Sequence, residues 1–222
     1  MNKLLKLRDK RTDLDNVEIK FGEFWEKDRR SVSRWIRSAL MRKARSLTLH
    51  THHDEFLYLL GDRLVASPHL TTLDLVGVGI FRPFLDFAGC PALEDLRMHE
   101  CHICVPDISS SSLKHLSITG CNVDQRNRLR VSAPGLVSLK LDGFSGITPF
   151  FKNMVLLEKA CVNLGSRCRD VCSGYADSGI FCGADNTCSN CENYSNLVFL
   201  GRISSATHLE LISELPNVRY CS

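Results

Sequence analysis

The sequence predicts an α/β leucine-rich-repeat solenoid, with short parallel strands on a concave face and helices or loops on the convex face. Four copies of the phrase L-x-x-L-x-L end on the apolar pairs Leu73/Leu75, Leu96/Met98, Leu116/Ile118 and Leu139/Leu141. The first residues of these pairs, at positions 73, 96, 116 and 139, are 23, 20 and 23 residues apart, which fits the period of about 20–29 residues of leucine-rich repeats. A single residue, usually polar, separates the two apolar residues of each pair, and this alternation is typical of a strand with one buried face.

The chain divides into four segments on this interpretation. Residues 1–43 form an N-terminal strand and helix that cap the solenoid, and residues 44–162 hold the leucine-rich repeats. Residues 163–200 are a cysteine-rich insertion. Residues 201–222 hold one further repeat with a truncated C-terminus.

The capping segment contains two expected elements. Val17, Ile19 and Phe21 alternate with polar residues and predict a short strand. A helix is expected from Asp28 to about Lys43, because its apolar residues follow helical spacing with arginines opposite them. These apolar residues are Val32, Trp35, Ile36, Ala39 and Leu40. Such a helix suits the end of a solenoid, which needs a polar outer surface.

Further copies of the phrase flank the clear four. One lies at residues 44–49 and another at 157–162, where Ala160 replaces the first leucine of the pair. A last copy lies at 206–211, and its Leu209 follows Ala160 by 49 residues. This step indicates either two repeats or one repeat that carries an insertion.

The connecting segments are expected on the convex side as loops and short helices. Segments 61–67, 81–88 and 101–110 each follow a strand and end near a proline or a run of serines. A short helix packed inward is expected from the spacing of Ile80, Phe81, Phe84, Leu85 and Phe87.

Cys101 and Cys121 follow two of the strand phrases. Leucine-rich repeats place Asn or Cys at this position, where the side chain bonds the backbone of the turn. We therefore expect a structural role for both thiols.

The candidate protein-binding residues lie on the concave strand face, because side chains between the apolar ones point outward. They are Thr72, Asp74, Asp95, Arg97, Lys114, Ser117, Ser138 and Lys140. Their mixed charge indicates a polar, selective contact with a protein.

Composition and motifs limit the function classes. The chain has 28 basic and 25 acidic side chains and a formal net charge of +3, which gives no support to a nucleic-acid partner. Neither a membrane-spanning run nor a secretory signal stands out in the sequence, so we expect an intracellular protein, nuclear or cytoplasmic. Nucleotide-binding, zincin and hydrolase motifs are absent, and we expect no enzyme activity.

The repeat region resembles that of plant F-box/LRR proteins over nearly the whole chain. Segments 34–40, 67–75, 90–96 and 133–139 carry the resemblance. In that family an F-box docks onto a Skp-type adaptor of a cullin ubiquitin ligase, and the repeats select the protein to be ubiquitinated. The usual Leu-Pro opening of an F-box is absent from residues 1–43, so we expect a truncated member that binds the adaptor only if an F-box lies upstream in a longer product.

A cluster of six of the 11 cysteines lies between Cys161 and Cys191. Cys188 and Cys191 form a C-x-x-C pair that can chelate zinc, with other cysteines of the cluster completing a tetrahedral set. The candidate ligands are Cys168, Cys172, Cys182, Cys188 and Cys191. Their spacing matches no standard zinc finger, and unliganded thiols are the favoured alternative. We therefore expect either no cofactor or zinc. The alternative function is that of a zinc-stabilised structural or regulatory interaction module unrelated to ubiquitination.

Overall fold

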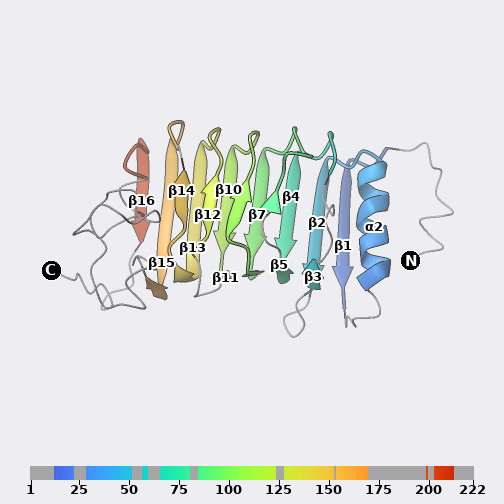
Figure 1. The fold of residues 1–222 in the computed structure, drawn as a ribbon, viewed down its shortest axis with the longest axis horizontal. Coiled ribbons are helices and arrows are strands. Elements are labelled where there is room, and N and C mark those ends of the chain that lie inside the picture. Colours follow the sequence, from blue (N-terminus) through green and yellow to red (C-terminus); the bar gives the residue numbers. More distant parts are fainter. Residues whose placement is uncertain are drawn as a thin grey trace.

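The computed structural model is a parallel β-solenoid whose coils follow one another along a single axis (Figure 1). It describes residues 13–22, 29–51, 57–59, 66–80, 85–123, 128–152, 154–169, 199 and 203–212. Within these ranges it contains one helix, α2 (Arg29–Met41), and strands make up the remaining regular structure. The predicted solenoid is therefore confirmed, and its convex side differs from the expectation.

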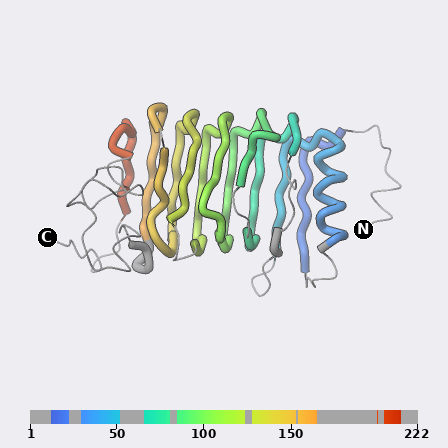
Figure 2. Tube along the Cα trace, in the orientation of Figure 1, coloured from blue at the N-terminus to red at the C-terminus, as the bar shows by residue number. Residues whose placement is uncertain are grey.

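The first ladder runs the full length of the solenoid and consists of parallel strands. In spatial order they are β1 (Asn16–Phe21), β2 (Ser46–Thr51), β4 (Thr72–Val76), β7 (Asp95–His99), β10 (His115–Thr119), β13 (Ser138–Ile147), β15 (Lys159–Arg169) and β16 (His208–Ile212). Figure 2 shows the same succession as a row of similar coils from the N-terminal to the C-terminal end.

The register of this ladder is the one that the repeats predict. Leu47, Leu73, Leu96, Leu116 and Leu139 lie opposite one another in successive strands, and each of these leucines is at most 2% exposed. The second apolar residue of each phrase forms a parallel buried row. Because side chains alternate between the two faces of a strand, this register sends every intervening side chain outward.

Strand pairing decides between the two interpretations of the 49-residue step from Ala160 to Leu209. β15 pairs directly with β16, so that Ala160 lies opposite Leu209 and Val162 opposite Leu211. One coil with an insertion therefore joins the two strands, and the alternative of two repeats is wrong. Leu209 and Leu211 remain about half-exposed in β16.

Backbone carbonyls just before the strands join consecutive coils. Each of these carbonyls accepts hydrogen bonds from two consecutive amides of the next coil. The N···O distances are 2.8–3.0 Å, within the range of good hydrogen bonds, for example 2.8 and 3.0 Å from Thr71 and Thr72 to Arg45. The accepting residues are Asp15, Arg45, Thr71, Glu94, Lys114 and Val137. This repeated geometry holds all strands of the first ladder in one register.

Loops and helices were expected on the remaining sides, and two further ladders of short strands lie there instead. The second ladder comprises β3 (Leu57–Leu59), β5 (Val78–Ile80), β8 (His102–Ile103), β11 (Asn122–Val123) and the distal part of β13. The third comprises β6 (Leu85–Asp86), β9 (Asp107–Ser109), β12 (Arg130–Ser132) and β14 (Phe150–Lys152).

The short helix expected around Ile80 and Phe87 is wrong where the structure describes that segment. Ile80 ends β5 and Leu85 begins β6, which belong to different ladders. Ile80 and Phe87 are nevertheless buried, at 1% and 2% exposure. Phe81 and Phe84 lie outside the described residues. The predicted burial of Ile80 and Phe87 is thus confirmed, and the predicted helical conformation is wrong.

The corner between the first and second ladders uses left-handed backbone conformations. Gly77, Gly120 and Gly143 have φ of 68°, 62° and 60°, and Glu100 occupies the equivalent position with φ of 52°. Glycine tolerates this region without strain. A Cβ on Gly77 would lie 2.6 Å from Oγ1 of Thr51, so position 77 has no room for a side chain.

α2 lies beyond β1 at the N-terminal end of the row (Figure 1). It begins and ends close to the expected positions, and Val32, Ile36 and Ala39 are at most 3% exposed. The rings of Trp35 and Phe21 stack with centroids 6.1 Å apart. The predicted helix and the predicted strand before it are confirmed. Among the described residues, no helix has the length and apolar character needed to cross a lipid bilayer.

Candidate functional site

The outer face of the first ladder is the candidate site, and it consists of three rows of outward side chains. We call the side chains of these rows the outer face. The row nearest the strand starts holds Asn16, Ser46, Thr72, Asp95, His115, Ser138, Lys159 and His208. The middle row holds Glu18, Thr48, Asp74, Arg97, Ser117, Lys140, Cys161 and Glu210. The last row holds Lys20, His50, Val76, His99, Thr119, Asp142, Asn163 and Ile212.

The structure brings seven of the eight predicted binding residues together on this face. Asp74, Arg97, Ser117 and Lys140 are neighbours in the middle row, and Thr72, Asp95 and Ser138 belong to the row beside it. All seven are exposed or half-exposed.

Lys114 is the exception among the predicted residues. It precedes β10 and lies in the turn at the edge of the outer face. Its Nζ is 2.7 Å from Oε1 of Glu94, the residue just before β7 in the preceding coil. The hydrogen bond and charge of Lys114 lower the pKa of Glu94.

Opposite charges on the outer face are paired along individual strands. In β7, Nη2 of Arg97 is 3.6 Å from Oδ1 of Asp95. In β13, Nζ of Lys140 is 3.7 Å from Oδ2 of Asp142, whose Oδ1 accepts a 2.9 Å hydrogen bond from Nδ2 of Asn163. The two ion pairs are long and solvent-exposed, so they hold Arg97 and Lys140 only weakly and leave them available to a partner.

Sequence reasoning missed the histidines of the outer face. His99 and His115 are exposed on adjacent strands, and His50 and His208 lie on β2 and β16. The signal was present, because each occupies an outward position of the same alternating phrase.

Cys161 is the one thiol of the middle row. It is half-buried and lies between Lys140 and Glu210 on the neighbouring strands. Burial raises its pKa, and a hydrogen bond with Glu210 raises it further. Both effects favour the neutral form of the thiol.

Cys101 and Cys121 occupy the structural position that was expected for them. Sγ of Cys101 donates to the carbonyl of Leu75 over 3.2 Å, and Sγ of Cys121 donates to that of Met98 over 3.4 Å. Both thiols thus bond the backbone of the preceding coil, as predicted.

The proposed zinc ligands fall almost entirely outside the described residues. Cys172, Cys182, Cys188 and Cys191 all lie there. The backbone of Cys168 belongs to β15 and pairs with Gly146. Among the residues that the structure describes, no three His, Cys, Asp or Glu side chains are grouped to hold a metal ion.

The outer face offers a regular grid of polar groups. Neighbouring strands are about 4.8 Å apart and successive outward residues of a strand are roughly 7 Å apart. Hydroxyl, carboxylate, guanidinium and imidazole groups occupy this grid in alternation. Such an arrangement suits recognition of an extended surface by many hydrogen bonds. No protein-family model, curated protein or solved structure matches this chain.

Proposed function

We propose that this chain is a protein-binding leucine-rich-repeat module, similar to the substrate-recognition region of F-box subunits of Skp-cullin-F-box ubiquitin ligases. The outer face is the observation that carries the proposal. In this proposal, the outer face selects a protein substrate, and α2 caps the N-terminal end of the repeats. The resemblance to plant F-box/LRR repeats supplies the ligase context.

The dimensions of the outer face favour a protein partner over a small ligand. Eight strands about 4.8 Å apart give a face roughly 34 Å long, which matches the scale of a protein interface. Its central charges are of both signs, with Asp74, Arg97 and Lys140 in one row. Surfaces of mixed charge give specificity through matched pairs of opposite charges.

A binding role without catalysis is part of the same proposal. The chain would act inside the cell, in the nucleus or the cytoplasm, where ubiquitin ligases operate. A Skp-type adaptor would join it only through an F-box encoded upstream.

Affinity capture from plant cell extract tests the proposal. The immobilised wild-type chain is compared with Arg97→Glu, which reverses a charge at the centre of the outer face. Lys152→Glu is the matched control, because Lys152 is exposed on β14 in the third ladder. We expect a protein that is retained by the wild type and the control and lost with Arg97→Glu. Equal retention by all three proteins would contradict the proposal. Adaptor and cullin in the same eluates would show that this chain itself binds the adaptor, and would contradict the need for an F-box encoded upstream.

A further inference from the structure

The basic charge of the chain is concentrated at one end of the solenoid. Residues 29–45 hold seven of the 28 basic side chains and none of the 25 acidic ones. The rest of the chain is consequently net acidic, with 21 basic against 25 acidic side chains. Within a net charge of +3, residues 29–45 thus form a local basic segment without an acidic side chain.

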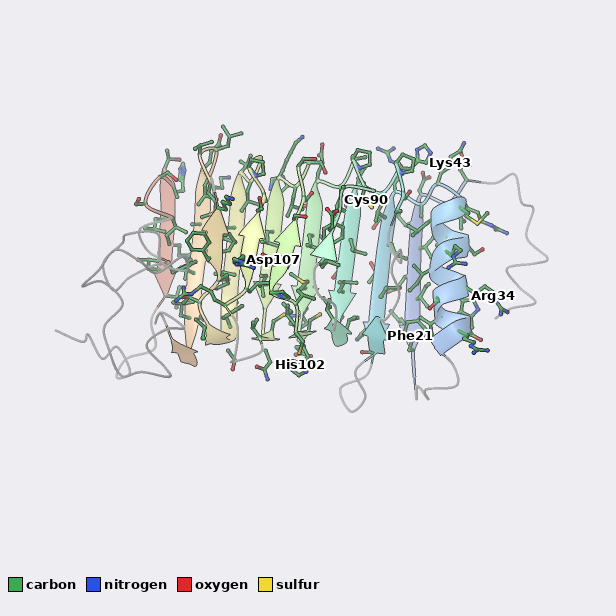
Figure 3. All side chains as sticks on the ribbon, viewed as in Figure 1. Phe21, Arg34, Lys43, Cys90, His102 and Asp107 are labelled. Carbon is green, nitrogen blue, oxygen red and sulfur yellow. The ribbon has the colours of Figure 1, made fainter. Side chains whose placement is uncertain are left out.

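Within this segment, one row of side chains follows the outer side of α2. Arg30, Arg34, Arg37 and Met41 are separated by 4, 3 and 4 residues, the spacing that keeps side chains along one line of a helix. All four are exposed, Met41 to 79%. Figure 3 shows Arg34 pointing away from the strands. The opposite side of the helix is buried against the solenoid.

The three arginines of this row are unpaired in the part of the chain that the structure describes. No ion pair or hydrogen bond of their guanidinium groups occurs there. Arg130, by contrast, binds Asp107 through Nε at 2.7 Å and Nη2 at 3.0 Å. Three like charges on successive turns of one helix repel each other, and an anionic partner relieves that repulsion.

We propose that this row is a docking surface for an acidic helix of a partner protein. The row is about 16 Å long at a rise of 1.5 Å per residue. A second helix that lies along α2 meets the same row with its own residues spaced by three and four. Glutamate or aspartate at those positions forms paired hydrogen bonds with the guanidinium groups.

Met41 distinguishes a protein partner from a nucleic acid. Its exposed side chain extends the row at its C-terminal end, and a thioether offers an apolar contact that adapts to another side chain. The partner helix is expected to carry an apolar residue beside Met41. A nucleic acid would bind the arginines through its phosphates and make no use of Met41, so binding of nucleic acid is the alternative that the experiment tests.

Fluorescence anisotropy with a designed peptide tests the proposal. The probe is a labelled helix-forming peptide of alanine, glutamate and one terminal leucine, with its glutamates along one face. The control peptide has the same composition with the glutamates spread around the helix. We expect the one-faced peptide to bind the wild-type chain at least about tenfold more tightly than the control peptide.

Matched variants locate the binding surface. Arg34→Glu/Arg37→Glu should weaken binding of the one-faced peptide at least about tenfold. Arg34→Lys/Arg37→Lys keeps the charge and loses the paired hydrogen bonds, so it should weaken binding less. Arg130→Glu/Lys152→Glu makes the same change in net charge on the third ladder, away from α2 and from the outer face, and should leave binding intact. Circular dichroism confirms that each variant is folded.

Three results would overturn the proposal. One is equal affinity for the two peptides, and another is loss of binding in the Arg130→Glu/Lys152→Glu variant. The third concerns a short DNA duplex. If the wild-type chain binds the duplex more tightly than the one-faced peptide, and Arg34→Glu/Arg37→Glu abolishes that binding, the row binds phosphates. None of these results bears on the outer face as the site of substrate recognition.

Discussion

The backbone N–H of Cys101 donates a hydrogen bond to Sγ of Cys121 over 3.3 Å, so a side chain joins two successive coils inside the core. Both cysteines are at most 1% exposed. The hydrogen bond between the two thiols, followed by burial, raises the pKa of Cys101. Both side chains therefore act as neutral hydrogen-bonding groups at the corner where the chain leaves the first ladder.

Replacing Cys121 with alanine should destabilise the fold by about 1–3 kcal/mol, because the N–H of Cys101 loses its acceptor in a dry environment. Urea unfolding followed by circular dichroism measures this free energy. Cys161→Ala is the matched control, since Cys161 is half-buried on the outer face, and its effect should stay below about 1 kcal/mol. Equal losses for the two variants would show that the Cys101–Cys121 contact is unimportant.

The register of the first ladder predicts opposite outcomes for adjacent positions. Leu116→Asp places a carboxylate in the shared core and should cost roughly 3 kcal/mol or more. Ser117→Asp adds the same group on the outer face and should change the free energy of unfolding by less than about 1 kcal/mol. The same urea titration checks both, and comparable effects would mean that β10 is placed in the wrong register.

The corner glycines should differ from glycines elsewhere. Gly77→Ala combines φ of 68° with a Cβ 2.6 Å from Oγ1 of Thr51, so it should cost about 1–2 kcal/mol or more. In Gly22→Ala the added Cβ meets nothing within 4 Å, and stability should be nearly unchanged. Thermal unfolding of the two variants side by side checks this expectation; a stable Gly77→Ala protein would contradict the corner geometry.

The Glu94–Lys114 ion pair predicts a measurable pH dependence. The pKa of Glu94 is lowered in the folded state, so the stabilising contribution is present above the unfolded pKa of about 4.3 and is lost as the pH falls through the lowered folded value. In Lys114→Ala the pKa of Glu94 should rise toward its ordinary value, as followed by carbon-detected NMR titration. An unchanged pKa of Glu94 in Lys114→Ala would contradict the contribution of this ion pair.

Sequence periodicity was sufficient for the first ladder. A period of two residues fixes which side chains face inward, and the repeat spacing aligns Leu73 with Leu96 and Leu116. The same two rules place Asp74, Arg97, Ser117 and Lys140 in one outward row. Most of the candidate site followed from these rules because a regular ladder leaves little freedom in how the coils stack.

The second and third ladders were beyond such reasoning. Strands such as Asn122–Val123 and Leu85–Asp86 contain two residues, which is too short for alternation to be recognised. Their extended conformation depends on pairing with the coils on either side. Spacing alone therefore suggested a helix between Ile80 and Phe87, where tertiary pairing decides the outcome.

Sequence separation also failed to place the last strand. A step of 49 residues from Ala160 to Leu209 is compatible with one coil or two, because an insertion leaves the stacking of the flanking strands unchanged. The arginine row of α2 was visible as basic residues opposite the apolar stripe. Only the structure shows that those arginines face away from the solenoid and lack partners among the described residues.

Site-specific photocrosslinking tests the assignment of the outer face most directly. A photoreactive phenylalanine analogue replaces Ser117 in the middle row of the outer face, and in a second protein it replaces Ser132, which is exposed on β12 in the third ladder. After illumination in cell extract, we expect a discrete crosslinked protein from position 117 and none from position 132. A crosslink from position 132 alone, or the same product from both positions, would contradict the assignment of the outer face as the protein-binding site.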